Sequence, residues 1–233
     1  MNNISVVEIE VKVYLIENIN SEEQNTYLSK LIDSTLALNK DYLDLHNENK
    51  FKNYCFGGLH PTEKDGVYKG DKIYSFRIRT IDKELAEYIR KNINSMATKR
   101  FKVLKNDIKI IPQKQIEKLF SVQPVVIKGD NGYWKNSMSF DEYIERIKVN
   151  LIKKYNEYTN EKIREDFQFY TSFEMKNNKP IKIPYKDISL LGDKCDILIA
   201  DDECSQRIAY IALGTGIGEN VSRGAGFVNF RWV

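Results

Sequence analysis

The 233-residue sequence predicts an α+β protein made of two successive units with antiparallel sheets. Three patterns lead to this fold class. Apolar and polar residues alternate near the N-terminus, which is typical of a half-buried strand, and apolar residues then recur every three or four positions, which is typical of a helix. The same order of strand and helix starts again in the second half of the chain, and this repeat predicts two units.

The first unit is expected to occupy residues 1–112. Its opening strand is followed by Ser21-Glu-Glu-Gln24, which has the spacing of a helix capping box, and Asp82 stands where a second helix needs its N-cap. Asp65-Gly66 marks a turn between the middle strands. The expected elements, in order, are strand 7–15, helix 21–43, strand 51–59, strand 73–80, helix 82–93 and strand 101–111. This β-α-β-β-α-β order is that of a ferredoxin-like domain.

The second unit, residues 113–233, is expected to be a degraded, strand-rich ferredoxin-like domain that begins after Pro112. An apolar strand at 120–127 and a polar turn precede a helix that starts at Ser139 and carries apolar residues on one face. The rest of the unit is predicted as strands, including Tyr210–Leu213 and the last residues of the chain. The sequence therefore predicts tandem ferredoxin-like domains, with helices covering one face of each sheet.

The composition favours a soluble cytoplasmic protein without a metal. Hydrophobic residues make up 42% of the chain, yet no run approaches the roughly 18 apolar residues of a membrane span, and the N-terminus lacks the pattern of a signal peptide. Cys55, Cys195 and Cys204 form no C-x-x-C pair, and only two histidines are available to share a metal with them. No metal site and no cofactor are therefore expected.

Positive charge is concentrated in one segment, although the net charge of the chain is only +3. Residues 69–105 contain eleven Lys or Arg against four acidic residues, so this segment carries +7 and the rest of the chain −4. Such a segment is the electrostatic footprint of a surface that binds a polyanion. A solvated helix and strand of mixed charge explains it equally well.

Five of the twelve glycines lie within thirteen residues near the C-terminus, at positions 214, 216, 218, 224 and 226. Glycine is favoured where φ is positive or where another backbone or a phosphate comes close. With Ser222 and Arg223 between them, the glycines predict a surface of amide donors and one guanidinium that suits an extended anion. A dinucleotide-binding or phosphate-binding loop must open a helix, whereas only a short strand follows here. A glycine-rich hairpin is the alternative.

The spacing of these glycines is specific. A G-x-G, five residues, a second G-x-G and an aromatic residue, here Gly216–Gly218 and Gly224–Phe227, end the two predicted domains. In this the chain resembles the CRISPR-associated repeat-processing endoribonucleases of the repeat-associated RNA-binding superfamily, over nearly its whole length. Lys72–Thr80 is similar to the family's third strand and Gln123–Val126 to the start of its second domain, while Ala225 stands where bulky residues are usual.

The resemblance implies a metal-independent endoribonuclease that matures CRISPR transcripts. A ribose 2′-hydroxyl would attack the neighbouring phosphate, giving a 2′,3′-cyclic phosphate and a 5′-hydroxyl. His46 follows the first helix, where many members place their catalytic histidine, and Lys52 would neutralise the charge that develops on the phosphate. Tyr42 or Tyr27 from the first helix would orient a hydroxyl or donate to a phosphate.

The same resemblance implies CRISPR repeat RNA as the partner. Arg223 is the best candidate for a backbone phosphate contact, and Arg77 and Arg79 share one face of a strand because residues two apart point the same way. The expected RNA-binding residues are Gly214, Gly216, Gly218, Ser222, Arg223, Gly224, Gly226, Arg77 and Arg79, with Lys72, Lys99, Arg100 and Lys102 as further phosphate contacts. Other CRISPR effector subunits and a second copy of the chain are partners that the resemblance allows, and no membrane is expected.

Several alternatives stay open. His60, which follows two glycines, could be the catalytic histidine, and Lys50 could supply the cation. Tyr133 and Trp134 could stack on unpaired bases or anchor their own loop. The chain could also be a non-catalytic RNA-binding subunit of an effector complex, or a nucleotide-binding enzyme or sensor that uses the glycine run alone.

Overall fold

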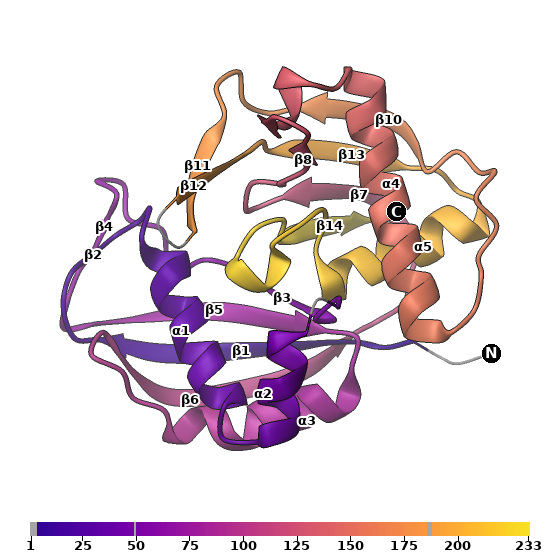
Figure 1. The fold of residues 1–233 in the computed structure, drawn as a ribbon. Helices are drawn as coiled ribbons and strands as arrows, with labels where there is room; N and C mark the ends of the chain where they lie inside the picture. Colours follow the sequence, from indigo (N-terminus) through magenta and orange to yellow (C-terminus); the bar gives the residue numbers. More distant parts are fainter. Residues whose placement is uncertain (1–3, 49, 186–187) are drawn as a thin grey trace.

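The computed structural model describes residues 4–48, 50–185 and 188–233, with the backbone alone at residues 45–47. These residues form two four-stranded antiparallel sheets, each with helices packed on one face (Figure 1). No helix in these ranges is long and apolar enough to cross a membrane. The predicted α+β fold class with antiparallel sheets is confirmed.

The first unit contains the long strands near the bottom of Figure 1. Its elements are β1 Val6–Leu15, β2 Ile19–Asn20, α1 Gln24–Leu36, α2 Lys40–Asn47, β3 Tyr54–Phe56, β4 Val67–Tyr68, β5 Lys72–Thr80, α3 Lys83–Asn92, a 3-10 turn Ile93–Ser95 and β6 Phe101–Ile111. The sheet order is β3-β5-β1-β6, and β2 and β4 form a separate short ribbon. The alternation in β1 buries every second side chain beneath α1 and α3, as its period of two predicts.

The predicted first helix is two helices. α1 ends before Asn39, whose backbone is extended and whose side chain accepts a hydrogen bond from Asp41 N (2.8 Å). Asn39 is therefore the N-cap of α2, a short helix that reaches Asn47. His46 lies inside this second helix, where the sequence predicted a polar segment after a single helix.

The second unit starts at Ile116, a few residues after the first sheet ends at Ile111. Its elements are β7 Ile116–Ser121, β8 Lys128–Gly129, β9 Gly132–Tyr133, a 3-10 turn Trp134–Asn136, α4 Phe140–Thr159, β10 Tyr170–Met175, β11 Ile181–Tyr185, β12 Ile188–Gly192, β13 Cys195–Ile199, α5 Glu203–Thr215, a 3-10 turn Val221–Arg223 and β14 Val228–Trp232. Its sheet order, β10-β13-β7-β14, repeats that of the first unit, and β11 and β12 form a hairpin inserted between its middle strands.

α5 corrects the sequence interpretation of the second unit. Tyr210–Leu213, predicted as a strand, lies inside this helix, which begins after Asp202, whose side chain accepts from Cys204 N and Ser205 N. The last eight residues of the helix are all buried, so no polar face reveals a helical period. With α5 in place the second unit has the complete β-α-β-β-α-β order, and the prediction of a degraded domain is wrong.

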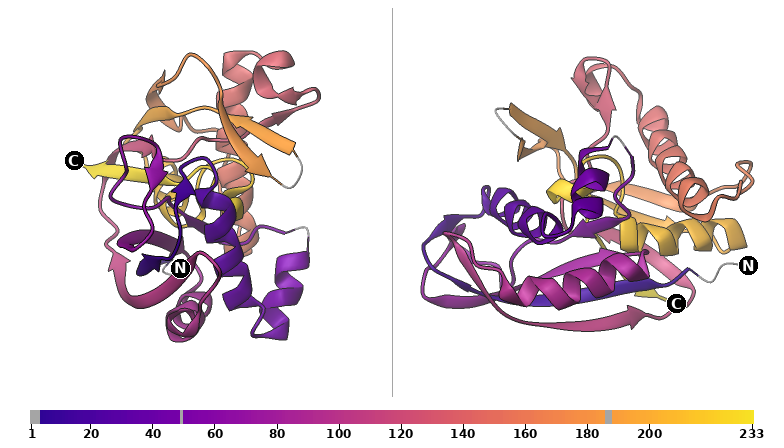
Figure 2. Two further views of the ribbon diagram at one scale, coloured as in Figure 1. Left: turned by 90° about the vertical axis from the view of Figure 1, so that its left-hand side faces the viewer. Right: turned by 60° about the horizontal axis from the view of Figure 1, so that its bottom comes forward.

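The two units meet through α5 and the glycine run. The Tyr210 hydroxyl of α5 accepts from Val6 N (3.1 Å) and donates to the Ile111 oxygen (2.6 Å), so it bonds to the start of β1 and the end of β6, which pair with each other at one end of the first sheet. Figure 2 shows α5 next to the start of β1. The C-terminal residues therefore lie at the junction of the units.

Candidate functional site

The glycine loop, residues 214–226, folds back on itself between the two units (Figure 1). Gly226 has φ 60°, and a Cβ there would lie 1.9 Å from the Ile217 oxygen. Gly218 has φ 77°, and a Cβ there would lie 2.5 Å from the Val126 oxygen. A hydrogen bond from Ile217 N to the Gly226 oxygen (2.9 Å) joins the two arms. These glycines are required by close backbone contacts within the protein.

The loop packs against the first unit. A Cβ on Gly224 would lie 2.7 Å from Asn25 Cγ, and Asn25 donates a hydrogen bond to the Gly224 oxygen (3.1 Å). All five glycines of the loop are buried, namely Gly214, Gly216, Gly218, Gly224 and Gly226. The prediction that these glycines form an exposed anion-binding surface is therefore wrong, because protein atoms cover them.

Ser222 and Arg223 form the tip of the loop and are partly exposed. The Arg223 guanidinium donates a hydrogen bond to Asp33 of α1 (2.5 Å). Burial raises the pKa of the Tyr54 hydroxyl on β3, Asp33 acts in the same direction, and Arg223 and Ser222 act in the opposite one. The tip therefore brings a cation of the second unit onto α1 and β3 of the first.

Lys52 lies within electrostatic reach of Arg223 at this tip. Its ammonium donates to the Glu48 oxygen (2.6 Å), directly after the end of α2. Burial lowers the pKa of Lys52, and the charges of Arg223 and Lys50 lower it further, while Glu48 acts in the opposite direction. Lys52, Ser222 and Arg223, called the loop-tip cluster from here on, thus place two cations within electrostatic reach of each other, and this arrangement favours a bound anion.

The C-terminal end of α2 is joined to this cluster through Lys52. His46 is the second-last residue of the helix, and the carbonyl that Lys52 contacts belongs to Glu48, two residues later. The side chain of His46 lies outside the described part of the structure, so its catalytic role stays a prediction. His60 has other neighbours: its backbone pairs with Ser75 of β5 (2.7 and 2.8 Å), and its side chain is exposed.

The two candidate tyrosines pack elsewhere in the first unit. The Tyr42 ring lies 4.4 Å from that of Tyr88 on α3, and burial together with carboxylates at the start of α3 raises the pKa of Tyr42. The Tyr27 ring lies 5.3 Å from the Arg100 guanidinium carbon, near the start of β6. These contacts do not support the predicted catalytic role of either phenol.

Arg79 is a buried clamp between the units. It is 2% exposed, and it donates to Glu8 (2.7 Å), to the Val228 oxygen (2.6 Å) and to Asn229 (2.9 Å). Burial raises the pKa of Glu8, but Arg79, Lys109 and Arg77 together more than offset this, so the pKa stays below its usual value. The prediction of Arg79 as an RNA contact is wrong, because its donors face protein. Arg77, on the same face of β5, is 44% exposed.

A cleft of about 530 Å³ opens between the units, on the side of Arg77. Its wall includes Asn25, which bonds to the glycine loop and also donates to Gln123 of the second unit (3.4 Å). The side chains around the cleft that carry an amide, an imidazole or a positive charge are Gln24, Asn25, His60, Arg77, Gln123, Lys182, Lys194 and Asn229, and Glu22 is an acidic one. The mixture of amides and cations suits a ligand with hydrogen-bonding edges and negative charge.

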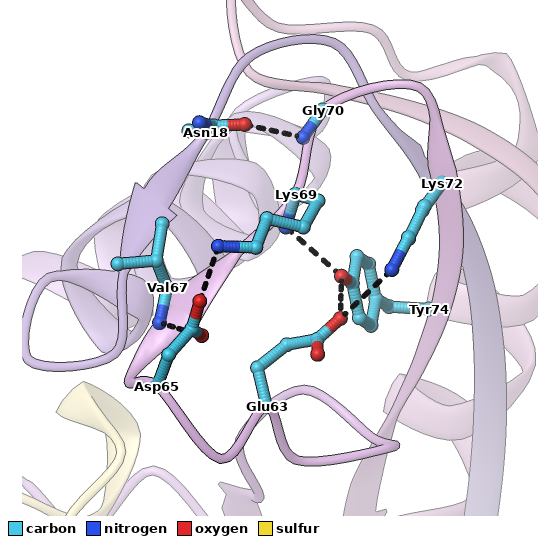
Figure 3. Close-up of polar contacts among 8 residues, drawn as sticks. All are labelled: Asn18, Glu63, Asp65, Val67, Lys69, Gly70, Lys72 and Tyr74. Carbon is cyan, nitrogen blue, oxygen red and sulfur yellow. Dashed lines mark hydrogen bonds and ion pairs between the residues drawn. The ribbon is translucent and has the colours of Figure 1, made fainter.

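Acidic partners neutralise part of the basic segment. Figure 3 shows the insert before β5, where Lys69 contacts Asp65 (2.5 Å) and Lys72 lies 3.5 Å from Glu63. Tyr74 also donates to Glu63 (2.5 Å). Arg100, another predicted phosphate contact, pairs with Glu17. The positive charge that this segment presents to a polyanion is therefore smaller than the +7 counted from its sequence.

Tyr133 and Trp134 anchor their own loop. The Tyr133 hydroxyl and the Trp134 indole N–H both donate to the buried carboxylate of Asp193 (2.7 Å each). Trp134 also stacks on Tyr143 at 4.2 Å. Of the two interpretations of these aromatic residues, the structure therefore favours anchoring over stacking on bases.

Metal-ligating side chains do not gather within the described ranges. No three His, Cys, Asp or Glu residues there lie close enough together to hold an ion. Cys55 and Cys195 are buried free thiols, and burial raises the pKa of each to about 12.

Sequence reasoning missed two residues that hold the glycine loop in place. Asp33 accepts a hydrogen bond from Arg223, and Lys154 of α4 donates hydrogen bonds to carbonyl groups at the base of the loop. Lys154 carried a signal, because it stands on the apolar face of its predicted helix. Asp33 is an ordinary polar helix residue and carried none.

The fold and the loop-tip cluster define the class of protein. It has two ferredoxin-like domains in tandem and presents cations at the junction of its units. Residues 120–230 match the family model described as CRISPR associated protein Cas6, C-terminal. This match covers just under half of the chain, and it confirms the resemblance inferred from the glycine spacing. No curated protein matches the sequence.

Solved structures with this fold match nearly the whole chain. One is described as CRISPR associated protein Cas6, with a TM-score of 0.72, 23% identity, and coverage of 97% of this chain and 99% of that chain. A RAMP protein binding different RNA substrates has a TM-score of 0.69, 18% identity, and coverage of 97% and 99%. A Thermus thermophilus Cas6 product complex has a TM-score of 0.64, 10% identity, and coverage of 98% and 100%. At these identities the likeness shows the tandem ferredoxin-like fold.

Proposed function

We propose that the protein is an endoribonuclease that cuts CRISPR repeat RNA without a metal ion, by attack of a ribose 2′-hydroxyl. One observation carries this proposal. The glycine loop brings Arg223 of the second unit within electrostatic reach of Lys52 of the first, and Lys52 bonds to Glu48 at the end of the helix that contains His46. The match of residues 120–230 to the Cas6 C-terminal family supports the same activity.

The reaction needs a base, an acid and positive charge. The 2′-oxygen bonds to the neighbouring phosphorus as its proton passes to the base, and the bond to the 5′-oxygen breaks as the acid protonates that oxygen. His46 can serve as base or acid because an imidazole has an ordinary pKa of about 6.5. Lys52 stabilises the charge on the phosphoryl oxygens, a contribution of about 3 kcal/mol from one well-placed donor. The products carry a 2′,3′-cyclic phosphate and a 5′-hydroxyl.

The cleft provides a second place for the RNA. Unpaired bases offer donor and acceptor edges to amides such as Gln24 and Gln123, and Arg77 with the nearby lysines attracts phosphates. Asn25 lines the cleft and also bonds to Gly224, the residue after Arg223. A strand held in the cleft is therefore adjacent to the loop that carries the loop-tip cluster.

The two histidines of the chain provide a matched pair of variants. Wild type, His46→Ala and His60→Ala are incubated with end-labelled repeat RNA in excess chelator. Wild type and His60→Ala should cut at one site, while His46→Ala should lose about 100-fold or more in rate. Cleavage that depends on added magnesium, or equal rates for the two variants, contradicts the proposal.

A second candidate function is RNA binding without cleavage, within an effector complex. It is favoured by the likeness to a protein described as binding different RNA substrates. This role predicts that His46→Ala and His60→Ala both leave RNA processing unaltered, while Arg223→Glu abolishes binding. The two functions therefore separate in the same set of variants.

A further inference from the structure

A buried cation from the second unit holds the base of the glycine loop. Lys154, on the inner face of α4, is 1% exposed. Its ammonium donates to the oxygens of Gly216 (2.8 Å), Gly218 (3.0 Å) and Thr215 (3.4 Å). An ammonium has three N–H donors, so the loop and the end of α5 account for all of them.

The charge of Lys154 is costly at this position. Burial lowers the pKa of the ammonium to about 7, and the two titratable groups that raise it are Cys55 on β3 and Glu219 in the loop. The negative end of α5 offsets part of the cost. Its three hydrogen-bond partners are neutral carbonyls, which offset less of this desolvation cost than a carboxylate would. Stability alone therefore does not explain a lysine here.

Lys154 is connected to both chain segments that supply the loop-tip cluster. The carbonyls of Gly216 and Gly218 face its ammonium, and Ile217 between them bonds to Gly226 on the returning arm, three residues after Arg223. The ammonium also lies 5.9 Å from the centroid of the Phe51 ring, and Phe51 directly precedes Lys52. One cation thus contacts the two chain segments that supply the cluster.

We propose that Lys154 is a positioning residue of the RNA-cleaving site, whose ammonium holds the glycine loop in register with the Phe51–Lys52 segment. The effect of this role on cleavage rests on the proposed function. The holding of the loop itself can be measured without RNA. Loss of the ammonium should leave the fold intact and allow the loop to move. Displacement of a catalytic group by about 1 Å can cost about 100-fold in rate.

The first test is hydrogen exchange of the free protein. Lys154→Met keeps the length of the side chain and removes its donors, and Lys153→Met changes the exposed neighbour on the same helix. Amides of the loop, Ile217 and Gly226 among them, should exchange roughly tenfold faster in Lys154→Met, with core strands unchanged. Lys153→Met should match wild type. Unchanged loop exchange in Lys154→Met overturns the proposal, whatever the RNA assay gives.

The second test separates rate from affinity. At saturating repeat RNA, Lys154→Met should cut about 100-fold more slowly than wild type, while its dissociation constant for RNA changes by no more than about threefold. A merely structural role would lower the rate and weaken the binding of RNA in proportion to the folded fraction, and that result overturns the proposal, as does an unchanged rate. If wild type itself does not cut, the proposed function fails, and this outcome is distinct from unchanged loop exchange.

Discussion

Two arginines make contacts across the boundary between the units, one in a buried environment and the other in a partly exposed one. Arg79 is buried, with its donors directed at Glu8, Val228 and Asn229. Arg223 is partly exposed at the loop tip, where it meets Asp33 and lies within electrostatic reach of Lys52. The same residue type therefore joins the units at one place and presents charge near the surface at the other. Burial, which the sequence does not display, decides between the two roles.

The largest expected effect is at the buried arginine. Arg79→Met should lower the free energy of unfolding by about 3 kcal/mol, because Glu8 stays buried with only the exposed Lys109 (3.0 Å) and Arg77 (3.7 Å) as its remaining cations. Urea denaturation measures this loss. Arg77→Met, on the same face of β5 but exposed and 3.7 Å from Glu8, should cost less than about 1 kcal/mol. Equal losses in the two variants would contradict the assignment of Arg79 as the clamp.

At the loop tip the effect should appear in the rate of cleavage. Lys52→Ala should reduce single-turnover cleavage about 100-fold without a comparable loss of stability, because a donor to the phosphoryl oxygens is removed. Lys50→Ala is the control, since Lys50 is 62% exposed and pairs with Glu48. If Lys50→Ala is as slow as Lys52→Ala, general positive charge and not the position of Lys52 supports the reaction.

A smaller effect is expected on RNA affinity. Arg223→Ala should weaken binding and reduce the slope of log affinity against log salt by about one, as for the loss of one phosphate contact. Filter binding over a range of salt concentrations measures the slope. Arg231→Ala removes an exposed arginine that pairs with Glu117 on the second sheet, and it should leave the slope unchanged. An unchanged slope in Arg223→Ala means that the tip does not contact the RNA backbone.

The smallest effect concerns pH and Lys154. Its folded pKa of about 7 lies below the ordinary 10.5, so above pH 7 the folded protein releases a proton that the unfolded chain retains. The stability of wild type relative to Lys154→Met should therefore rise between about pH 7 and about pH 10, and stay level below pH 7. Melting temperatures of the two proteins across this range provide the comparison. A flat difference means that Lys154 keeps its ordinary pKa.

Much of the fold could be predicted from periodicity. The strand at 101–111 matches β6 at both ends, and the alternation at 7–15 predicts β1 because one face of that strand is buried. α5 could not be found in this way, because a helix end that is buried on all sides shows no period. The α+β class was therefore predictable, whereas the completeness of the second unit was not.

The candidate site was predictable only in part. The glycine spacing indicates the family because backbone contacts within the loop demand glycine at set positions. Nothing in the sequence shows that Arg79 meets Glu8, since the two are 71 residues apart and pair only across neighbouring strands. The place of Lys154 on the apolar face of its helix signals burial, but its partners could not be predicted, because backbone carbonyls carry no residue signature.

The central claim is that the loop-tip cluster and the end of α2 form a site for attack by a 2′-hydroxyl. The most direct test is a repeat RNA with a single 2′-deoxy nucleotide on the 5′ side of the cut, compared with the all-ribose RNA in chelator. The deoxy RNA should bind with unchanged affinity and remain uncut, and the all-ribose product should end in a 2′,3′-cyclic phosphate. Cleavage of the deoxy RNA at the same site would contradict this mechanism.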